Sequence, residues 1–295
     1  MGRQFPAPAA PRRTSRRVKQ VNLPDGTAVA ALGQGTWRLG EGARPAAEEA
    51  AALVAGIDRG MTLIDTAEMY GEGGAERVVG RAIAGRRDGV FVVTKVYPQN
   101  ASRDGIAAAC ARSLDRLGIA GIDLYLLHWR GGVPLRETVA GFEALRRDGR
   151  IRRWGVSNFD VDDLEELYAV EGGERCAVNQ VLYNVETRGI EWDLLPWCER
   201  HRLPIMAYSP VGQAGRLLRS KALAAVGKRH GATPAQVAIA WTLRRPGVIS
   251  IPKAATKAHV EENAAAASLA LTDDDLTAID GAHPPPRRKQ PLGML

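Results

Sequence analysis

The chain has 295 residues, enough for one large α/β domain or two smaller ones, and its 45% hydrophobic and 25% charged residues are typical of a globular protein. The net charge of +7 does not indicate a nucleic-acid partner. Residues 1–20 alone hold five Arg and one Lys with no acid, and the remaining 34 basic side chains nearly balance 33 acidic ones. No apolar run approaches the roughly 18 residues of a membrane-spanning helix, so no membrane partner is expected.

The three cysteines, Cys110, Cys176 and Cys198, show no CxxC spacing. This pattern argues against a disulfide framework and against a zinc site, and it favours a reducing compartment. We therefore expect a cytoplasmic protein without a bound metal.

The first segment in chain order is a tail, residues 1–17, rich in Pro, Ala and Arg. It has too few apolar side chains to offset the entropy lost on ordering, so we predict that it is disordered. Residues 18–295 are expected to form a single domain. Its first element is a predicted β-hairpin, Val18 to Leu32, which turns at "LPDGT".

Eight short segments rich in β-branched residues follow the hairpin and predict eight strands. In chain order they are "ALGQGTW", "GMTLIDTAEMY", "GVFVVTKV", "IDLYLLHW", "RRWGVSNF", "CAVNQVLYN", "LPIMAYSP" and "GVISIPKA". Stretches of helical period, such as "PLRETVAGFEALRRDG", separate most of them. This alternation predicts the α/β class and a (β/α)₈ TIM barrel with an N-terminal hairpin and a short C-terminal tail.

An open, doubly wound sheet is the alternative architecture. Such a sheet usually has a glycine-rich phosphate turn that leads from its first strand directly into a helix. The nearest match, "GQGTWRLG", leads into a long loop instead, so the sequence favours the barrel.

Polar or aromatic side chains follow every predicted strand, at the carboxyl ends where barrels hold their active sites. They are Thr36–Trp37, Asp65, Lys95, His128, Ser157–Asn158, Gln180, Tyr208–Ser209 and Lys253. Any one of them alone is compatible with a structural role, but eight in register predict a functional rim. Tyr70 lies five residues beyond Asp65, in the loop above. A phenol beside an ammonium and a carboxylate suits protonation of a forming alkoxide, and His128 can hydrogen-bond the same oxygen.

With these motifs the chain resembles the aldo-keto reductases over residues 18–290 and, among bacterial members, the diketogluconate-reductase-like group. The resemblance rests on "GQGTW", "IDTAEMYGEGGAERVVGRAI", "VVTKV", "DLYLLHW", "GVSNF", "VNQVLYN", "AYSPVG" and "SIPKAATKAHVEENAAA", in family order. It implies a monomeric carbonyl reductase that acts on aldehydes or small ketones and uses NADPH by preference, with NADH possible. It also implies a catalytic tetrad of Asp65, Tyr70, Lys95 and His128, with Tyr70 as proton donor.

The same resemblance implies where the cofactor and the substrate lie. Ser157, Asn158 and Gln180 would hold the nicotinamide carboxamide, and Tyr208 would stack on the ring. The other implied cofactor contacts are Thr36, Trp37, Asp65, Ser209, Pro210, Val211, Gln213, Ile251, Lys253, Thr256, His259, Glu262 and Asn263. Trp37, Tyr70, His128 and Trp129 would surround the carbonyl.

Three positions depart from the family pattern. Ala254 stands where many members have a serine that binds the 2′-phosphate, and His259 stands where many have an arginine. The loop after "YSPVG" offers Arg216 but no acid for a cofactor-clamping salt bridge. The first two weaken the expectation of a strict NADPH preference, and the third favours fast cofactor exchange. The short loop after His128 and the short C-terminal tail predict an open pocket with broad substrate use.

Two other functions are compatible with parts of the pattern. One is a cofactor-binding regulatory or redox-sensing subunit of the same fold, against which the intact tetrad argues. The other is a metal-dependent barrel hydrolase, against which the single histidine among the strand ends argues.

Overall fold

The computed structural model describes residues 19–295, so the predicted disordered tail, 1–17, lies outside the described residues. Eight parallel strands form one sheet in the order β10-β9-β8-β7-β6-β5-β4-β3. Bridges Leu32↔Ser250 and Gly35↔Lys253 join its two edges and close the barrel. The strands are β3 (Gln34–Gly35), β4 (Leu63–Asp65), β5 (Phe91–Val96), β6 (Ile122–Leu127), β7 (Ile151–Ser157), β8 (Asn179–Leu182), β9 (Ile205–Tyr208) and β10 (Val248–Ser250). The predicted barrel is confirmed.

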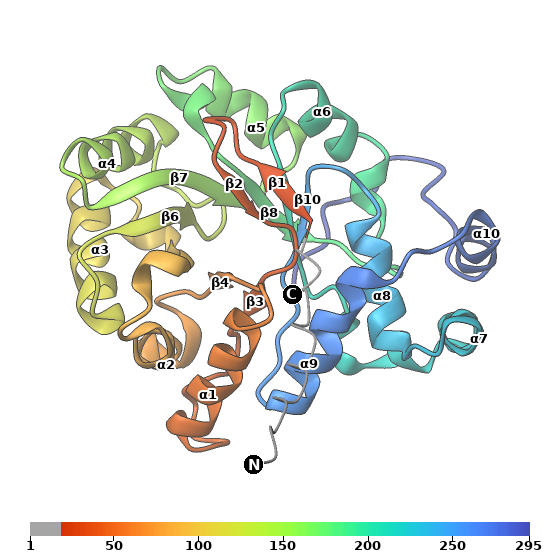
Figure 1. Cartoon of the computed structure of the whole chain (residues 1–295). Helices are drawn as coiled ribbons and strands as arrows, with labels where there is room; N and C mark the ends of the chain where they lie inside the picture. The colour runs from red at the N-terminus through yellow and green to blue at the C-terminus, as the bar shows by residue number, and fades with distance from the viewer. Residues whose placement is uncertain (1–18) are drawn as a thin grey trace, which may run out of the picture.

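Helices surround the strands, as Figure 1 shows. They are α1 (Ala46–Ile57), α2 (Gly74–Ile83), α3 (Arg103–Leu117), α4 (Leu135–Arg147), α5 (Val161–Tyr168), α6 (Leu194–Arg200), α7 (Lys221–His230), α8 (Pro234–Leu243), α9 (Lys257–Ala265) and α10 (Asp273–Ala282). Local sequence sets several of their starts. Thr233 and Thr272, for example, each cap a helix through a capping box with the residue three positions on.

The predicted hairpin is also confirmed, as β1 (Gln20–Asn22) paired antiparallel with β2 (Ala28–Ala30). Gly26 takes a left-handed conformation in the turn, with φ 84°. Val21, Leu23 and Val29 share one buried cluster with side chains of the barrel interior such as Leu124. The hairpin therefore closes the amino end of the barrel and leaves the carboxyl end available for function.

No helix within residues 19–295 is long and apolar enough to cross a membrane.

Candidate active site

The two-residue period of the strands places the polar rim. Side chains at alternate positions face the same side of a strand. A residue two positions after an inward apolar residue therefore also points into the barrel, nearer its carboxyl end. The interior cluster contains Leu63, Val93, Leu126, Val178, Met206 and Ile251. Two positions beyond each of them stand Asp65, Lys95, His128, Gln180, Tyr208 and Lys253, respectively. The rim is therefore the top layer of the barrel interior.

Lys95 is the centre of this layer. Its side chain is fully buried, and its Nζ donates to Asp65 Oδ2 at 2.8 Å and to the Thr66 carbonyl at 2.8 Å. The same Nζ lies 3.2 Å from the Tyr70 hydroxyl. Gln180 Nε2 donates to the other Asp65 oxygen at 2.7 Å. Each polar atom that Asp65 and Lys95 bury here thus has a partner, as a buried ion pair requires.

Burial and neighbouring charges set the protonation states of Lys95 and Tyr70. Burial alone would lower the pKa of the Lys95 ammonium, but Asp65 and Tyr70 raise it above its usual value, so the lysine stays charged. Burial raises the pKa of Tyr70, and Lys95 opposes only part of that rise. Desolvation of the phenol therefore outweighs the lowering effect of the neighbouring ammonium on the pKa of Tyr70. The phenol therefore remains a neutral acid with a cation at its oxygen.

His128 follows β6 directly and is buried beside Tyr70. Their ring centroids are 5.8 Å apart in an edge-to-face arrangement. Burial, and then the nearby Lys95 charge, lower the pKa of His128 to about 2, so its imidazole is neutral across the physiological range. Among the described residues, its Nδ1 is buried without a hydrogen-bond partner. A neutral imidazole with an unused nitrogen suits hydrogen bonding to a ligand.

The loop between β4 and α2 brings Tyr70 over the barrel. The buried Glu68 carboxylate fixes this loop, because it accepts the Tyr97 main-chain N–H at 2.9 Å and Asn100 Nδ2 at 3.1 Å. The chain turns at Gly71, where φ is 55°. The sequence analysis did not identify Glu68, although it stands in the quoted motif "IDTAEMYG". Its position as a second acid, three residues after Asp65 and two before Tyr70, is the signal that could have found it.

Aromatic rings form the wall beside the tetrad. Trp129 lies 5.0 Å from His128 between ring centroids, as the predicted pocket wall requires. Tyr97 packs edge-to-face on Trp129 at 5.9 Å and extends that wall, although the sequence analysis did not select it. Trp37 is half-buried at the carboxyl end of β3, and the Arg38 guanidinium lies 4.4 Å above its ring.

The predicted nicotinamide contacts lie together on β7, β8 and β9. Asn158 Nδ2 donates to Ser157 Oγ at 3.2 Å and to the His128 carbonyl at 3.1 Å. Its Oδ1 accepts from the Tyr208 hydroxyl at 3.0 Å. The Gln180 amide nitrogen is engaged with Asp65, which leaves its carbonyl oxygen as the free hydrogen-bonding atom. The Thr36 hydroxyl is likewise engaged, because it donates to the Asp65 carbonyl at 2.9 Å.

The loops of the rim contain most of the strained backbone. Within residues 19–295, seven non-glycine residues have positive φ, and six of them follow carboxyl ends of barrel strands: Arg38, Glu72, Asn158, Ser209, Gln213 and Ala214. Such conformations cost free energy, and they concentrate at sites that need a particular backbone shape. Pro210 and Val211 lie inside this strained stretch after β9, where Pro210 is buried and Val211 half-buried.

The predicted adenosine end lies around β10 and the start of α9. Thr256 caps α9 by accepting the His259 N–H at 3.3 Å, and His259 is exposed. Ile251 and Asn263 are buried. The Glu262 carboxylate accepts a hydrogen bond from the hydroxyl of Thr233, the residue that caps α8, at 2.6 Å.

Lys253 has more charged neighbours than its sequence position indicated. Burial, together with Arg38 and Arg44, lowers the pKa of Lys253, and Glu49 opposes that effect. The loop between β3 and α1 therefore adds two guanidinium groups near this lysine. Helices α1 and α9, which follow Arg44 and Lys253, lie side by side in Figure 1.

Two segments that the sequence analysis singled out, the Arg216 loop and the C-terminal tail, make specific contacts. Arg216, which lacks an acid within its own loop, pairs with Glu186 of the β8–α6 loop at 3.1 Å. The end of the C-terminal tail reaches the rim, because the Leu295 main chain lies beside the Tyr208 hydroxyl. The expectation of an open pocket stays a prediction.

A cavity of about 1270 Å³ lies at the opposite end of the barrel, between the hairpin and the amino ends of the strands. Each of its five arginines is within 4 Å of a carboxylate; they are Arg59, Arg87, Arg146, Arg152 and Arg153. None of the tetrad residues lines it. In the described part of the chain, no three His, Cys, Asp or Glu side chains are grouped to hold a metal ion.

Fold and rim together define a barrel oxidoreductase with a Tyr/Lys/Asp/His site, and comparison with known proteins gives its family. The aldo/keto reductase family model matches residues 31–284. Methylglyoxal reductase YeaE of Escherichia coli is 50% identical over 281 residues, covering 94% of this chain and 99% of that protein. Glyoxal reductase of Bacillus subtilis is 32% identical over 262 residues, covering 88% and 91%.

A solved structure agrees with these matches. A Klebsiella pneumoniae aldo-keto reductase in complex with NADPH superposes with a TM-score of 0.92 at 51% identity, covering 94% of this chain and 99% of that one. The chain belongs to the aldo/keto reductase family. The narrower resemblance to the diketogluconate-reductase-like group stays a prediction.

The depressed pKa of His128 predicts a pH dependence of stability. In the unfolded chain histidine titrates near 6.5, but in the folded protein His128 takes up a proton only near pH 2. The unfolded state therefore binds more protons between these values, and the free energy of unfolding falls as pH falls below 6.5. We expect His128→Gln to remove about 1.4 kcal/mol per pH unit of this slope between pH 6 and pH 4.

Denaturant titrations at pH 7, 6, 5 and 4 measure this effect. His201→Gln, at the exposed C-terminal end of α6, should retain the wild-type dependence of unfolding free energy on pH. Equal slopes for His128→Gln and wild type would show that His128 is protonated in the folded protein.

Proposed function

We propose that the protein is an NADPH-dependent carbonyl reductase that reduces aldehydes and small ketones at the carboxyl end of the barrel. The observation that carries this proposal is the buried chain of contacts from Asp65 through Lys95 to the Tyr70 hydroxyl. The names of the similar proteins, methylglyoxal reductase and glyoxal reductase, support small dicarbonyl aldehydes as the first substrates to test.

The residues on the rim fit a nicotinamide dinucleotide. The free Gln180 carbonyl and the Ser157 hydroxyl offer hydrogen bonds at one end, beside the half-buried Tyr208 ring. Cations around Lys253 stand at the other end, where a 2′-phosphate would need them. When bound, the reduced nicotinamide supplies a hydride to the carbonyl carbon of the substrate.

Within this site, Tyr70 gives its phenolic proton to the carbonyl oxygen as negative charge develops there. Lys95 stabilises the phenolate that remains, and Asp65 holds the lysine charged and oriented. Neutral His128 hydrogen-bonds the same oxygen and orients the substrate. Trp37 and Trp129 pack on its apolar part.

Cofactor preference follows from the adenosine end. Ser209, Val211 and Gln213 would hold the pyrophosphate, and Thr256, Glu262 and Asn263 would surround the adenosine. Lys253 would offer a point charge to the 2′-phosphate, with His259 beside it. NADPH is therefore preferred, with NADH as a weaker alternative.

The free, buried cysteines suit a reducing cytoplasm. Residues 18–295 act as one unit, and the protein acts as a monomer because all four tetrad residues come from one chain.

A turnover assay tests the proposal directly. Purified protein is mixed with NADPH and methylglyoxal, an aromatic aldehyde, a small ketone or a keto acid, and absorbance at the NADPH band is followed with and without a chelator. We expect oxidation with the aldehydes that the chelator does not change. Tight NADPH binding without turnover on any carbonyl would instead favour a regulatory subunit, and loss of activity with the chelator would favour a metal enzyme.

The proposed proton donor predicts the effect of Tyr70→Phe. Turnover should fall by at least about 10²-fold, because the phenol supplies general acid catalysis, while the NADPH dissociation constant stays within about twofold. Tyr168→Phe, on the outer helix α5, should retain turnover. A Tyr70→Phe enzyme with near-wild-type kcat would contradict the assignment.

The histidine at the adenosine end predicts the effect of an arginine on cofactor preference. His259→Arg should widen the preference for NADPH over NADH by on the order of 1.5–3 kcal/mol, the value of a charged hydrogen bond. The reason is that a guanidinium can hold a phosphate through two parallel hydrogen bonds. Dissociation constants of both cofactors measure this, with His201→Arg as control. A ratio that the arginine leaves unchanged would place His259 away from the phosphate.

A further inference from the structure

Two buried glutamates flank the proposed proton donor in the sequence. Glu68 stands two residues before Tyr70, and Glu76 stands six residues after it, in the first turn of α2. The side chain of Glu76 has no exposed surface, and that of Glu68 is only 6% exposed. A buried acid destabilises the fold unless donors satisfy its oxygens, so the donors indicate what each glutamate holds in place.

The donors to Glu76 come from two elements. Thr94 donates its hydroxyl to Oε1 at 2.6 Å, and Arg116 of α3 donates Nε to Oε2 at 2.5 Å. Thr94 immediately precedes Lys95 on β5, so its side chain leaves the opposite face of the strand, toward the helices. Glu76 therefore holds the start of α2 against the strand that carries the lysine.

The donors to Glu68 lie on the other side of the same lysine. Oε1 of Glu68 accepts the main-chain N–H of Tyr97, two residues after Lys95, at 2.9 Å. Oε2 lies 3.5 Å from Nη2 of Arg112. The main chain adds a further contact, because the Glu68 N–H donates to the Lys95 carbonyl at 3.3 Å. The loop that carries Tyr70 is thus bonded to β5 both before and after the lysine.

Helix α3 supports both glutamates. Arg112 and Arg116 are four residues apart, which places them on one face of the helix, one turn from each other. Arg116 is only 12% exposed and lies against the end of the Tyr70 loop. At Gly73, where φ is 82°, an added methyl would stand 2.4 Å from Cδ and Nε of Arg116. Both the backbone conformation and the arginine therefore require glycine there.

These contacts set a distance that no single element sets. Lys95 and Tyr70 come from different segments, and the Nζ and hydroxyl oxygen atoms are 3.2 Å apart. The attraction between an ammonium and a phenolate falls with distance. At an effective dielectric constant of about 20, an opening of about 1 Å weakens the phenol as an acid by roughly one pKa unit. The proposed reaction needs that acidity when the carbonyl oxygen takes the proton.

We propose that Glu68 and Glu76 are positioning residues that hold the loop against β5 and so keep the Tyr70 hydroxyl on the ammonium beside it. The inference rests on the proposed function, because it concerns the proton donor of that reaction. The two glutamates themselves take no part in proton transfer or in binding the cofactor. Loss of either set of hydrogen bonds lowers kcat and leaves the binding of NADPH and aldehyde unchanged.

Thr94→Val tests the contact with Glu76, because it removes one hydroxyl and keeps the shape of the side chain. We expect kcat for methylglyoxal to fall about three- to tenfold, the range that one pKa unit gives in general acid catalysis, while KM and the NADPH dissociation constant stay within about twofold. Thr94→Ser retains the hydroxyl and should retain most of the wild-type kcat. A Thr94→Val enzyme with wild-type kcat, or a Thr94→Ser enzyme as slow as Thr94→Val, would overturn the proposal.

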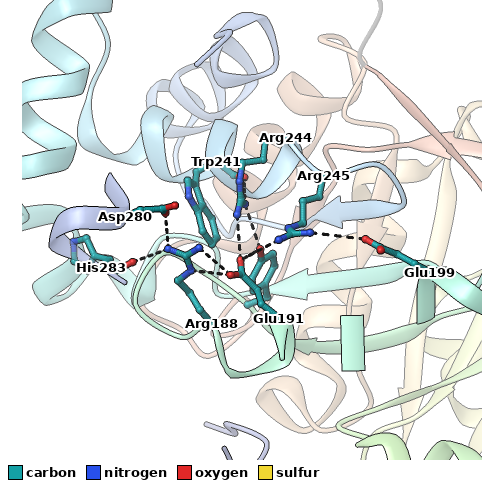
Figure 2. A network of polar contacts seen from close by, with 9 residues as sticks. Arg188, Glu191, Glu199, Trp241, Arg244, Arg245, Asp280 and His283 are labelled. Atoms are coloured by element: carbon teal, nitrogen blue, oxygen red, sulfur yellow. Dashed lines mark hydrogen bonds and ion pairs between the residues drawn. The ribbon is translucent and has the colours of Figure 1, made fainter. Parts of the chain in front are cut away.

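A second buried network, centred on Glu191 and Arg188, offers a matched control (Figure 2). Arg188 donates to Glu191 at 2.8 Å and to Asp280 of α10 at 2.7 Å. The Tyr183 hydroxyl donates to Glu191 at 2.5 Å, so this network joins the β8–α6 loop to α10. Tyr183→Phe removes the same kind of bond as Thr94→Val, a hydroxyl to a buried carboxylate. It should lower the melting temperature without changing kcat, and an equal fall in kcat would contradict a specific role for Thr94.

A double-mutant cycle with Tyr70→Phe separates positioning from a general loss of stability. If the Thr94 hydroxyl acts through the phenol, Thr94→Val should change the residual kcat of the Tyr70→Phe enzyme by less than about twofold. The same fractional fall in both backgrounds would overturn the proposal. If Thr94→Val does not fold, Asn100→Ala takes its place, because Asn100 donates to Glu68 at 3.1 Å from a half-buried position.

A crystal structure of Thr94→Val tests the positioning role without any turnover. We expect the distance between Lys95 Nζ and the Tyr70 hydroxyl to grow by about 1 Å, the opening that weakens the acid by one pKa unit. A distance that stays at the wild-type value refutes the positioning role, whatever the kinetics show. A wild-type protein without turnover on any carbonyl refutes the proposed function instead.

Discussion

The buried pair between Lys95 and Asp65 is the contact on which the rest of the site depends. An ammonium with no exposed surface is tolerable only because a carboxylate and a carbonyl accept its protons at 2.8 Å. Once the lysine is fixed and charged, Tyr70 has a cation at its oxygen. Burial keeps His128 neutral, and the lysine charge adds to that effect. Removing either partner would leave an unpaired charge at the top of the barrel core.

The barrel and the tetrad were predictable because both follow from local periodicity. A strand shows the same face at every second residue, so an apolar run that ends in a polar side chain identifies the inward residue at the rim. Leu126 followed by His128 is such a case, and Val93 followed by Lys95 is another. The order of strands then brings these ends together without any further information, since neighbouring strands of a parallel barrel point the same way.

The contacts that join distant segments were not predictable in this way. Arg188 reads as an ordinary loop arginine, and nothing near it in the sequence indicates that Asp280, 92 residues later, will meet it. Arg44 and Lys253 are still further apart and are close only because the first and last strands close the barrel. The contact of Lys289 in the C-terminal segment with Asp193 could not be predicted from the sequence for the same reason.

Strained backbone and buried charge are unevenly distributed: the amino end of the barrel contributes stability, and the carboxyl end holds the site. At the amino end the hairpin adds apolar side chains to the interior and covers it. At the carboxyl end, buried charges and left-handed residues such as Asn158 and Ser209 cost stability. A closed sheet with a continuous apolar interior can tolerate this loss of stability. Each of its strands is hydrogen-bonded to a neighbour on both sides, so no single strained loop can relax by moving its strand. Loops fixed in this way hold Tyr208, Asn158 and Tyr70 in one arrangement before any ligand arrives, which is the condition for stabilising a charge that exists only while the carbonyl is being reduced.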